Sequence, residues 1–138
     1  MSRSLALCID SRGGMMFNSR RQTRDKEVIE DLVALFRKGA IYIQQYSARL
    51  FEEYENIISC TDPVADCADG ALCFVEDARI LNDLSSFDTV VLYNWSIPYP
   101  ADVYFSFDLE SLGFKRISKD KLTTDIHTKV TREVFKRT

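Results

Sequence analysis

The chain has 138 residues, of which 46% are hydrophobic and 12% aromatic. That length predicts one domain, residues 1–138, and that composition is sufficient for a packed core, which excludes a disordered protein. No window reaches the roughly 18 apolar residues of a membrane span, and the apolar stretch near the N-terminus is too short for a signal peptide. We therefore expect a cytoplasmic protein with no membrane partner.

The net charge of −3 does not favour nucleic-acid binding, but it is unevenly distributed. Residues 52–88 hold ten acids and one base, whereas residues 115–138 hold eight bases and three acids. The four cysteines form no C-x-x-C pair and the chain has one histidine, so the sequence predicts no metal site.

Hydrophobic periodicity predicts the elements in chain order. The apolar run Leu5–Ile9 is typical of a buried strand and ends at Asp10 and a glycine turn. From Asp25, apolar residues on one helical face predict a helix that closes at Gly39. Ser47 precedes a second helical stripe, so it is a candidate N-cap. Further strands are predicted at residues 40–44, 56–60, 71–75 and 89–95, with a short helix at residues 78–84.

The last third of the chain has a different pattern. Residues 102–107, 114–118 and 128–135 mostly alternate apolar and polar side chains, which is typical of antiparallel strands with one wetter face. Together with the alternating strands and helices before it, this pattern predicts an α/β fold. Its central sheet is mostly parallel and flanked by helices, and its C-terminal end is an antiparallel hairpin.

The order of these patterns resembles the dihydrofolate reductase family. The segment "GGMMFNSRRQTRD" keeps the Gly, Met, Asn and Asp of that family's mobile loop and first helix start, although Arg20, Gln22 and Thr23 replace its Trp, Leu and Pro. Asp102 and Phe105 match its later G-D-T-H-F-P segment. The resemblance covers nearly the whole chain and implies a dihydrofolate reductase-like fold.

Asp25 has two interpretations that the sequence leaves open. The resemblance implies a catalytic carboxylate that contacts a pterin-like ring and favours protonation of an imine nitrogen, a role that burial would assist by raising the pKa of such a group. An aspartate at a helix start is also a typical N-cap, which stabilises the helix by roughly 0.5–2 kcal/mol. One residue can serve in both roles.

The cofactor motifs of the family are absent. Gln45 stands at the position of its phosphate-binding arginine, Asp62 stands where a cation would hold the 2′-phosphate, and Glu76 and Asp77 replace its paired glycines. A glycine turn lets backbone amides approach a pyrophosphate, and carboxylates oppose a polyanion. Residues 61–70 are also too few for an additional helix between two strands. We therefore expect no NADPH binding and assign no cofactor.

Other polar residues near predicted strand and helix ends are candidate ligand contacts. Arg20 and Arg21 belong to the arginine-rich loop 12–24, whose arginines can instead pair with acids such as Asp10. Tyr93 and Asn94 end the most apolar strand, where open α/β sheets place their ligands. The substrate-binding candidates are Arg20, Arg21, Ser47, Tyr93 and Asn94, and the catalytic candidate is Asp25.

Three functions follow from these residues. The favoured prediction is a divergent dihydrofolate reductase-like domain that binds a small molecule or a protein partner and is not a functioning NADPH-dependent reductase. The second is a small-molecule reductase in which Asp25 handles a proton. The third is an RNA-binding protein or nuclease that uses the loop 12–24 and His127.

Overall fold

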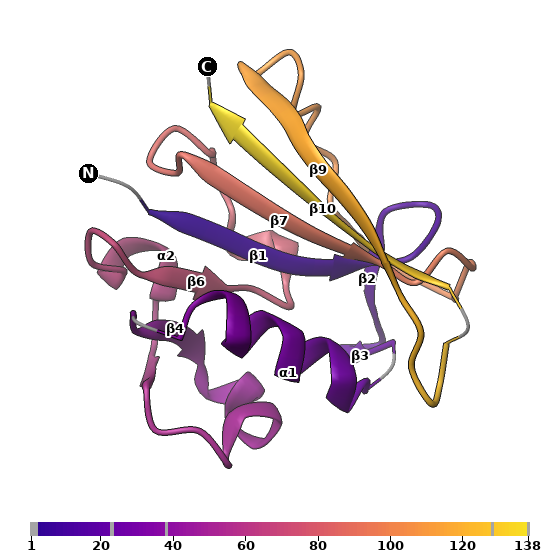
Figure 1. Ribbon diagram of the computed structural model, residues 1–138, viewed down its shortest axis with the longest axis horizontal. Coiled ribbons are helices and arrows are strands. Elements are labelled where there is room, and N and C mark those ends of the chain that lie inside the picture. The colour runs from indigo at the N-terminus through magenta and orange to yellow at the C-terminus, as the bar shows by residue number, and fades with distance from the viewer. Residues whose placement is uncertain (1–2, 23, 38, 128, 138) are drawn as a thin grey trace.

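The computed structural model describes residues 3–22, 24–37, 39–127 and 129–137. Its main sheet has seven strands in the order β5-β4-β6-β1-β7-β10-β9 (Figure 1). Thr23, one of the positions at which the chain departs from the reductase pattern, lies outside the described residues. The strands of this sheet are β1 (Ser4–Ile9), β4 (Ile41–Gln44), β5 (Ile57–Cys60), β6 (Leu72–Phe74), β7 (Thr89–Asn94), β9 (Phe114–Leu122) and β10 (Val130–Arg137).

The sheet is parallel from β5 to β7 and antiparallel at its C-terminal end. β1 pairs in parallel with β6 and β7, and β4 pairs in parallel with β5 and β6. β10 runs antiparallel to both β7 and β9. The apolar runs of β1 and β7 are buried on both sides, as parallel central strands require. The predicted fold class, with its C-terminal hairpin, is confirmed.

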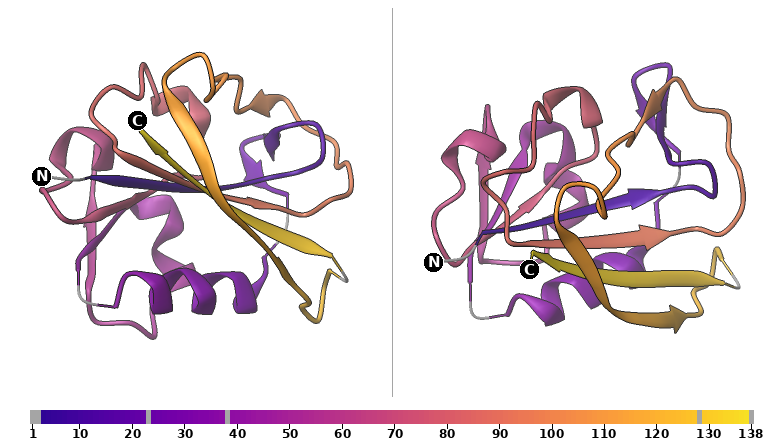
Figure 2. Two further views of the ribbon diagram at one scale, coloured as in Figure 1. Left: turned by 45° about the horizontal axis from the view of Figure 1, so that its top comes forward. Right: turned by 90° about the horizontal axis from the view of Figure 1, so that it is seen from above.

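One face of the sheet is covered by helix α1 (Lys26–Leu35), as the left view of Figure 2 shows. Val28, Ile29 and Leu32 are buried on this face, where each stabilises the fold by about 1.5–3 kcal/mol. Leu35, the last residue of the helix, is apolar but 45% exposed. The backbone N–H of Phe36 closes the helix by donating to the carbonyls of Leu32 and Val33.

The remaining helices are short. They are η1 (Gln45–Phe51), α2 (Pro63–Asp66) and η2 (Ala78–Ile80). Ser47 lies inside η1 and not at its start, so its predicted N-cap role is wrong. The eleven residues between β5 and β6 contain only the four-residue α2 among the described elements. None of the helices formed by the described residues has the length and apolar character that a membrane crossing requires.

A second, three-stranded sheet was not predicted from the sequence. It consists of β3 (Arg20–Arg21), β2 (Gly14–Phe17) and β8 (Val103–Tyr104), in that order. Asn18 and Ser19 have positive φ angles of 52° and 61°, which turn the chain from β2 into β3. The segment 102–107, expected in the C-terminal antiparallel region, contributes β8 to this small sheet because it pairs with β2.

Candidate functional site

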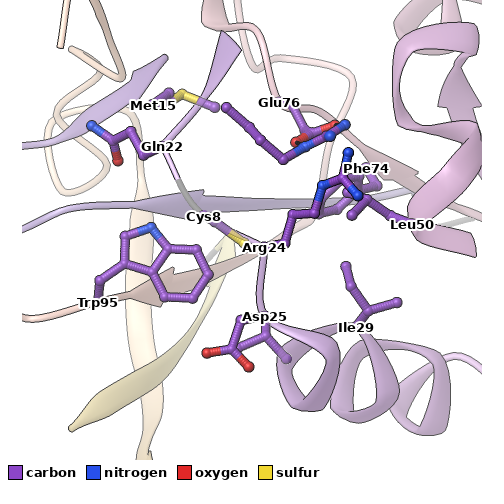
Figure 3. A pocket seen from close by; sticks show the side chains of 12 residues that line it. Cys8, Met15, Gln22, Arg24, Asp25, Ile29, Leu50, Phe74, Glu76 and Trp95 are labelled. Atoms are coloured by element: carbon purple, nitrogen blue, oxygen red, sulfur yellow. Dashed lines mark hydrogen bonds and ion pairs between the residues drawn. The ribbon is translucent and has the colours of Figure 1, made fainter. Parts of the chain in front are cut away.

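A cavity lies at the carboxyl ends of β1, β6 and β7, where α/β sheets bind their ligands. Cys8 and Phe74 from the strands and Trp95 just beyond β7 form part of its wall. The segment leading into α1 supplies Arg21, Gln22, Arg24 and Asp25. The enclosed space of the cavity is about 30 Å³, and about 430 Å³ is reached only when its open mouth is counted. Figure 3 shows Asp25 and Trp95 at one end of it and Glu76 at the other.

Asp25 occupies the N-cap position of α1, but its side chain does not cap the helix. Its carbonyl accepts a hydrogen bond from the N–H of Ile29 at 3.3 Å, and the side chain forms no capping bond. Instead, Oδ2 accepts hydrogen bonds from Thr124 Oγ1 at 2.6 Å and bonds to His127 Nδ1 at 2.9 Å. The predicted side-chain cap is therefore wrong, because the carboxylate turns away from the helix toward the β9–β10 connection.

The second carboxylate oxygen of Asp25, Oδ1, differs from Oδ2 in its hydrogen bonding. Oδ1 is buried and has no hydrogen-bond partner among the described residues. The residue as a whole is 3% exposed and lines the cavity. A buried acceptor left without a donor costs about 1–3 kcal/mol. Because Oδ1 has almost no accessible surface, a ligand donor can bond to it only if the side chains around it move.

His127 continues the hydrogen-bonded chain away from Asp25. Its Nε2 lies 2.8 Å from the hydroxyl of Tyr99, and its ring stacks on Trp95 with centroids 4.6 Å apart. A turn holds the ring in place, because the N–H of His127 donates to Thr124 Oγ1 and its carbonyl accepts from the N–H of Thr124. Buried carboxylate, imidazole and half-buried phenol thus form one continuous chain.

A second cluster surrounds Asp10, which is fully buried. Its Oδ1 accepts hydrogen bonds from the backbone N–H groups of Arg12 and Gly14, and its Oδ2 accepts from Gln22 Nε2 and the N–H of Tyr99. Burial opposes ionisation, but these hydrogen bonds outweigh it and lower the pKa of Asp10. The acid was expected to pair with arginine side chains of the loop; backbone amides and a glutamine satisfy it instead.

At the far end of the cavity, Arg21 forms a bidentate ion pair with Glu76. Arg21 Nε lies 2.7 Å from Glu76 Oε2, and Nη2 lies 2.9 Å from Oε1. Ser47 Oγ donates to the same Oε1 at 2.6 Å. The hydrogen bond that Arg21 donates to Glu76 raises the pKa of Arg21. Arg21 also lies over the ring of Tyr46, with its guanidinium carbon 4.6 Å from the ring centroid.

The negative charge expected near residues 76 and 77 is neutralised within the chain. Glu76 is paired with Arg21, and Asp77 with Arg79 at 2.9 Å. The Arg79 pair also lowers the pKa of Asp77. The prediction that two unpaired carboxylates repel a phosphate is thus corrected, since both acids already have cationic partners.

The predicted site residues separate into two groups. Asp25 and Arg21 line the cavity, and Ser47 reaches its margin through Glu76. Arg20 lies outside it, in a surface hollow with Arg21, Arg24 and Tyr46.

Tyr93 and Asn94 are not among the residues that line the cavity. Tyr93 is fully buried on the α1 face, and its hydroxyl donates to Asp31 Oδ2 at 2.6 Å. The side chain of Asn94 accepts a hydrogen bond from the N–H of Ser96. Trp95, one residue beyond the end of β7, lies in the cavity wall instead.

The predicted site residues did not include Gln22, Trp95 or Tyr99, and His127 was named only for the nuclease alternative. The position of Trp95 at the end of an apolar strand was a usable signal. For His127, the sequence signal was that it is the single histidine of the chain. Its partner Asp25 is 102 residues away, so no local pattern connects the two residues.

A larger groove of about 1070 Å³, measured out to its open mouth, lies beside the cavity. Gln45 and Asp77, two positions where the resemblance places phosphate contacts, line it together with the hydroxyls of Ser59 and Thr61. Among its described lining residues the one cation is Arg79, which is already paired. Nowhere in the described ranges do three or more His, Cys, Asp or Glu residues form a group that could hold a metal ion.

Comparison with solved structures identifies the fold. The chain is similar to a dihydrofolate reductase from Enterococcus faecalis complexed with NADP(H) and RAB-propyl, with a TM-score of 0.65 at 10% sequence identity. The match covers 99% of this chain and 96% of that one. No family model and no curated protein matches the sequence. The chain therefore has a dihydrofolate reductase-like fold.

Proposed function

We propose that this chain is a small-molecule-binding protein that uses the Asp25 cavity, and that it is not a functioning NADPH-dependent dihydrofolate reductase. The observation that carries the proposal is that Asp25 lines the cavity while its Oδ1 is buried without a partner among the described residues. A ligand N–H that reaches Oδ1 as the wall opens satisfies it, and a charged donor forms the stronger bond.

The other walls favour a flat, largely apolar ligand body. Met15, Val28, Phe74 and Trp95 supply aromatic and flexible apolar surface. Small-molecule sites commonly combine such walls with a few fixed polar groups. We therefore expect an aromatic or heteroaromatic ligand that carries an N–H donor.

The adjacent groove does not favour a dinucleotide phosphate. Arg79, its one cation among the described lining residues, is bonded to Asp77, and Arg21 at the nearby cavity is bonded to Glu76. A phosphate that recruited either arginine would leave a carboxylate without its partner. The Enterococcus faecalis protein is described as complexed with NADP(H), and that property is not carried over to this chain.

Calorimetric titration tests both parts of the proposal. Wild-type protein is titrated with benzamidine, an aromatic cation with several N–H donors, and separately with NADPH. We expect saturable benzamidine binding that Asp25→Asn weakens about tenfold or more, since the substitution removes the charge and one acceptor. Asp77→Asn, a matched change in the groove, should leave benzamidine binding unaltered. Saturable NADPH binding would refute the second part.

A proton-handling enzyme is the second candidate, because hydrogen bonds run without a break from Tyr99 through His127 to Asp25. Such a chain can deliver a proton from the half-buried phenol to a bound ligand. His127→Gln interrupts transfer while it preserves much of the side-chain volume. Loss of turnover with unchanged ligand affinity in this variant would establish the enzyme.

The remaining candidate residues and functions are supported by different observations. Arg20 and Arg24 form no ion pair with any described residue, so we propose that they face an anionic part of the ligand at the cavity mouth. A nuclease that uses His127 has less support, because that side chain is 1% exposed and bonded on both nitrogens. Contacts from Tyr93 and Asn94, a protein partner and cytoplasmic location stay predictions.

A further inference from the structure

We infer that a surface hollow beside the Asp25 cavity binds a phosphoryl group as its dianion. The described residues that line this hollow, here called the arginine hollow, are Arg20, Arg21, Arg24 and Tyr46. The inference rests on the proposed function, because the hollow and the cavity share Arg21 and Arg24. It names the anionic group that the ligand carries outside the cavity.

The arginine hollow is accessible, in contrast to the buried oxygen of Asp25. It has about 440 Å³ of open space, whereas the cavity encloses about 30 Å³. The side chains of Arg20, Arg24 and Tyr46 are all exposed. An anion therefore reaches these groups without opening the wall of the cavity.

Two of the three arginines have no counter-charge. Arg21 is paired with Glu76, but Arg20 and Arg24 form no ion pair with any described residue. Figure 3 shows Arg24 extending away from the neighbouring Asp25 carboxylate, toward the Glu76 end of the cavity. None of the described residues that line the hollow is an acid. Positive charges gathered in this way repel one another, and a bound anion relieves the repulsion.

Tyr46 supplies a neutral donor to the same hollow. Its hydroxyl oxygen accepts a hydrogen bond from the backbone N–H of Arg21 at 2.7 Å, and the Arg21 guanidinium lies over its ring. The carbonyl of Tyr46 accepts from Arg21 Nη2 at 3.1 Å. These contacts hold the phenol in place, while its hydroxyl hydrogen has no acceptor among the described residues. That hydrogen is available to a ligand oxygen.

This set of donors favours a phosphoryl group over a carboxylate. The two unpaired guanidinium groups carry two positive charges, which a phosphate monoester dianion neutralises and a carboxylate neutralises only in part. The ester also has three outer oxygens to accept hydrogen bonds from Arg20, Arg24 and Tyr46. The neighbouring groove differs, because Arg79 would have to release Asp77 before it could bind an anion.

The test compares phenyl phosphate with benzoate, two anions that share a ring. Both are titrated calorimetrically into wild-type protein at low ionic strength, since salt screens exposed charges. We expect phenyl phosphate to bind saturably and about fivefold more tightly than benzoate. Arg20→Gln and Arg24→Gln should each weaken its binding about fivefold, and Tyr46→Phe about threefold.

Arg37→Gln is the matched control. Arg37 is an exposed arginine that forms no ion pair with any described residue, and it follows the opposite end of α1. Its substitution should leave phenyl phosphate binding unchanged. An equal loss in Arg37→Gln and in the variants of the arginine hollow would refute the site, because binding would then depend on net charge alone.

The inference is also overturned if wild type shows no saturable binding of phenyl phosphate, if benzoate binds equally well, or if neither Arg20→Gln nor Arg24→Gln weakens binding. Inorganic phosphate, which lacks the ring, should bind more weakly, and equal affinity would refute a ligand that also contacts the cavity. Benzamidine binding to Asp25→Asn tests the proposed function separately. If only that test fails, the anion site remains; if only the phenyl phosphate test fails, the cavity remains.

Discussion

The cavity and the groove lie side by side, yet they differ in how their polar groups are satisfied. In the cavity, Asp25 and Gln22 each keep one buried oxygen without a partner among the described residues. In the groove, Asp77 and Arg79 satisfy each other, and Gln45 accepts a hydrogen bond from Ser59. Size alone would favour the groove, which is the larger of the two. The unsatisfied acceptors favour the cavity, because a donor that reaches either oxygen removes the cost of an unpaired buried acceptor.

The largest expected effect comes from Asp25→Ala. The substitution removes the partner of Thr124 and His127 and should lower the free energy of unfolding by about 2–3 kcal/mol, as well as abolish ligand binding. Urea denaturation measures the first effect and titration with benzamidine the second. Unchanged stability would show that the Asp25–His127 contact contributes nothing to the fold.

Arg21→Met should have the next largest effect. Among the described residues it leaves the half-buried carboxylate of Glu76 with Ser47 alone as a partner, and we expect a loss of about 1–2 kcal/mol of stability. The double variant Arg21→Met, Glu76→Gln should recover part of this loss because no charge is left unpaired. A double variant that is less stable than Arg21→Met would contradict the pairing.

Asp10 predicts a pH dependence. Its pKa is lowered in the folded state, so the stabilisation is fully present above the unfolded pKa of about 3.9 and is lost as the pH falls through the folded pKa. Melting temperatures recorded downward from pH 6 should therefore fall more steeply for wild type than for Asp10→Asn. Parallel curves for the two proteins would rule out this contribution.

Asp77→Asn should have the smallest effect. Arg79 is 61% exposed, and ion pairs this open to solvent contribute little to stability. We expect the melting temperature of this variant to match wild type within measurement error. A clear decrease would show that the groove is organised as rigidly as the cavity and would weaken the distinction between them.

The strands and the main helix were predictable because their signals are local. The apolar runs at residues 5–9 and 89–95 correspond to β1 and β7, and the stripe after Asp25 corresponds to α1. The small sheet escaped prediction because β2 acquires its pairing from β8, some 90 residues later in the chain. Its turn residues Asn18 and Ser19 adopt positive φ angles, but neither is the glycine that usually indicates such a turn in a sequence.

The sequence by itself determined the spacing of apolar residues along each strand and helix, and therefore the α/β class. This spacing can be read locally, because it depends on residues close together in the chain. Only the tertiary structure decided that the Asp25 carboxylate turns toward His127, that Asp10 orients Gln22, and that Arg21 neutralises Glu76. These contacts join residues far apart in the chain. The Asp25–His127 contact forms because β10 packs beside β7 and carries the β9–β10 connection to the start of α1, a placement that no local pattern encodes.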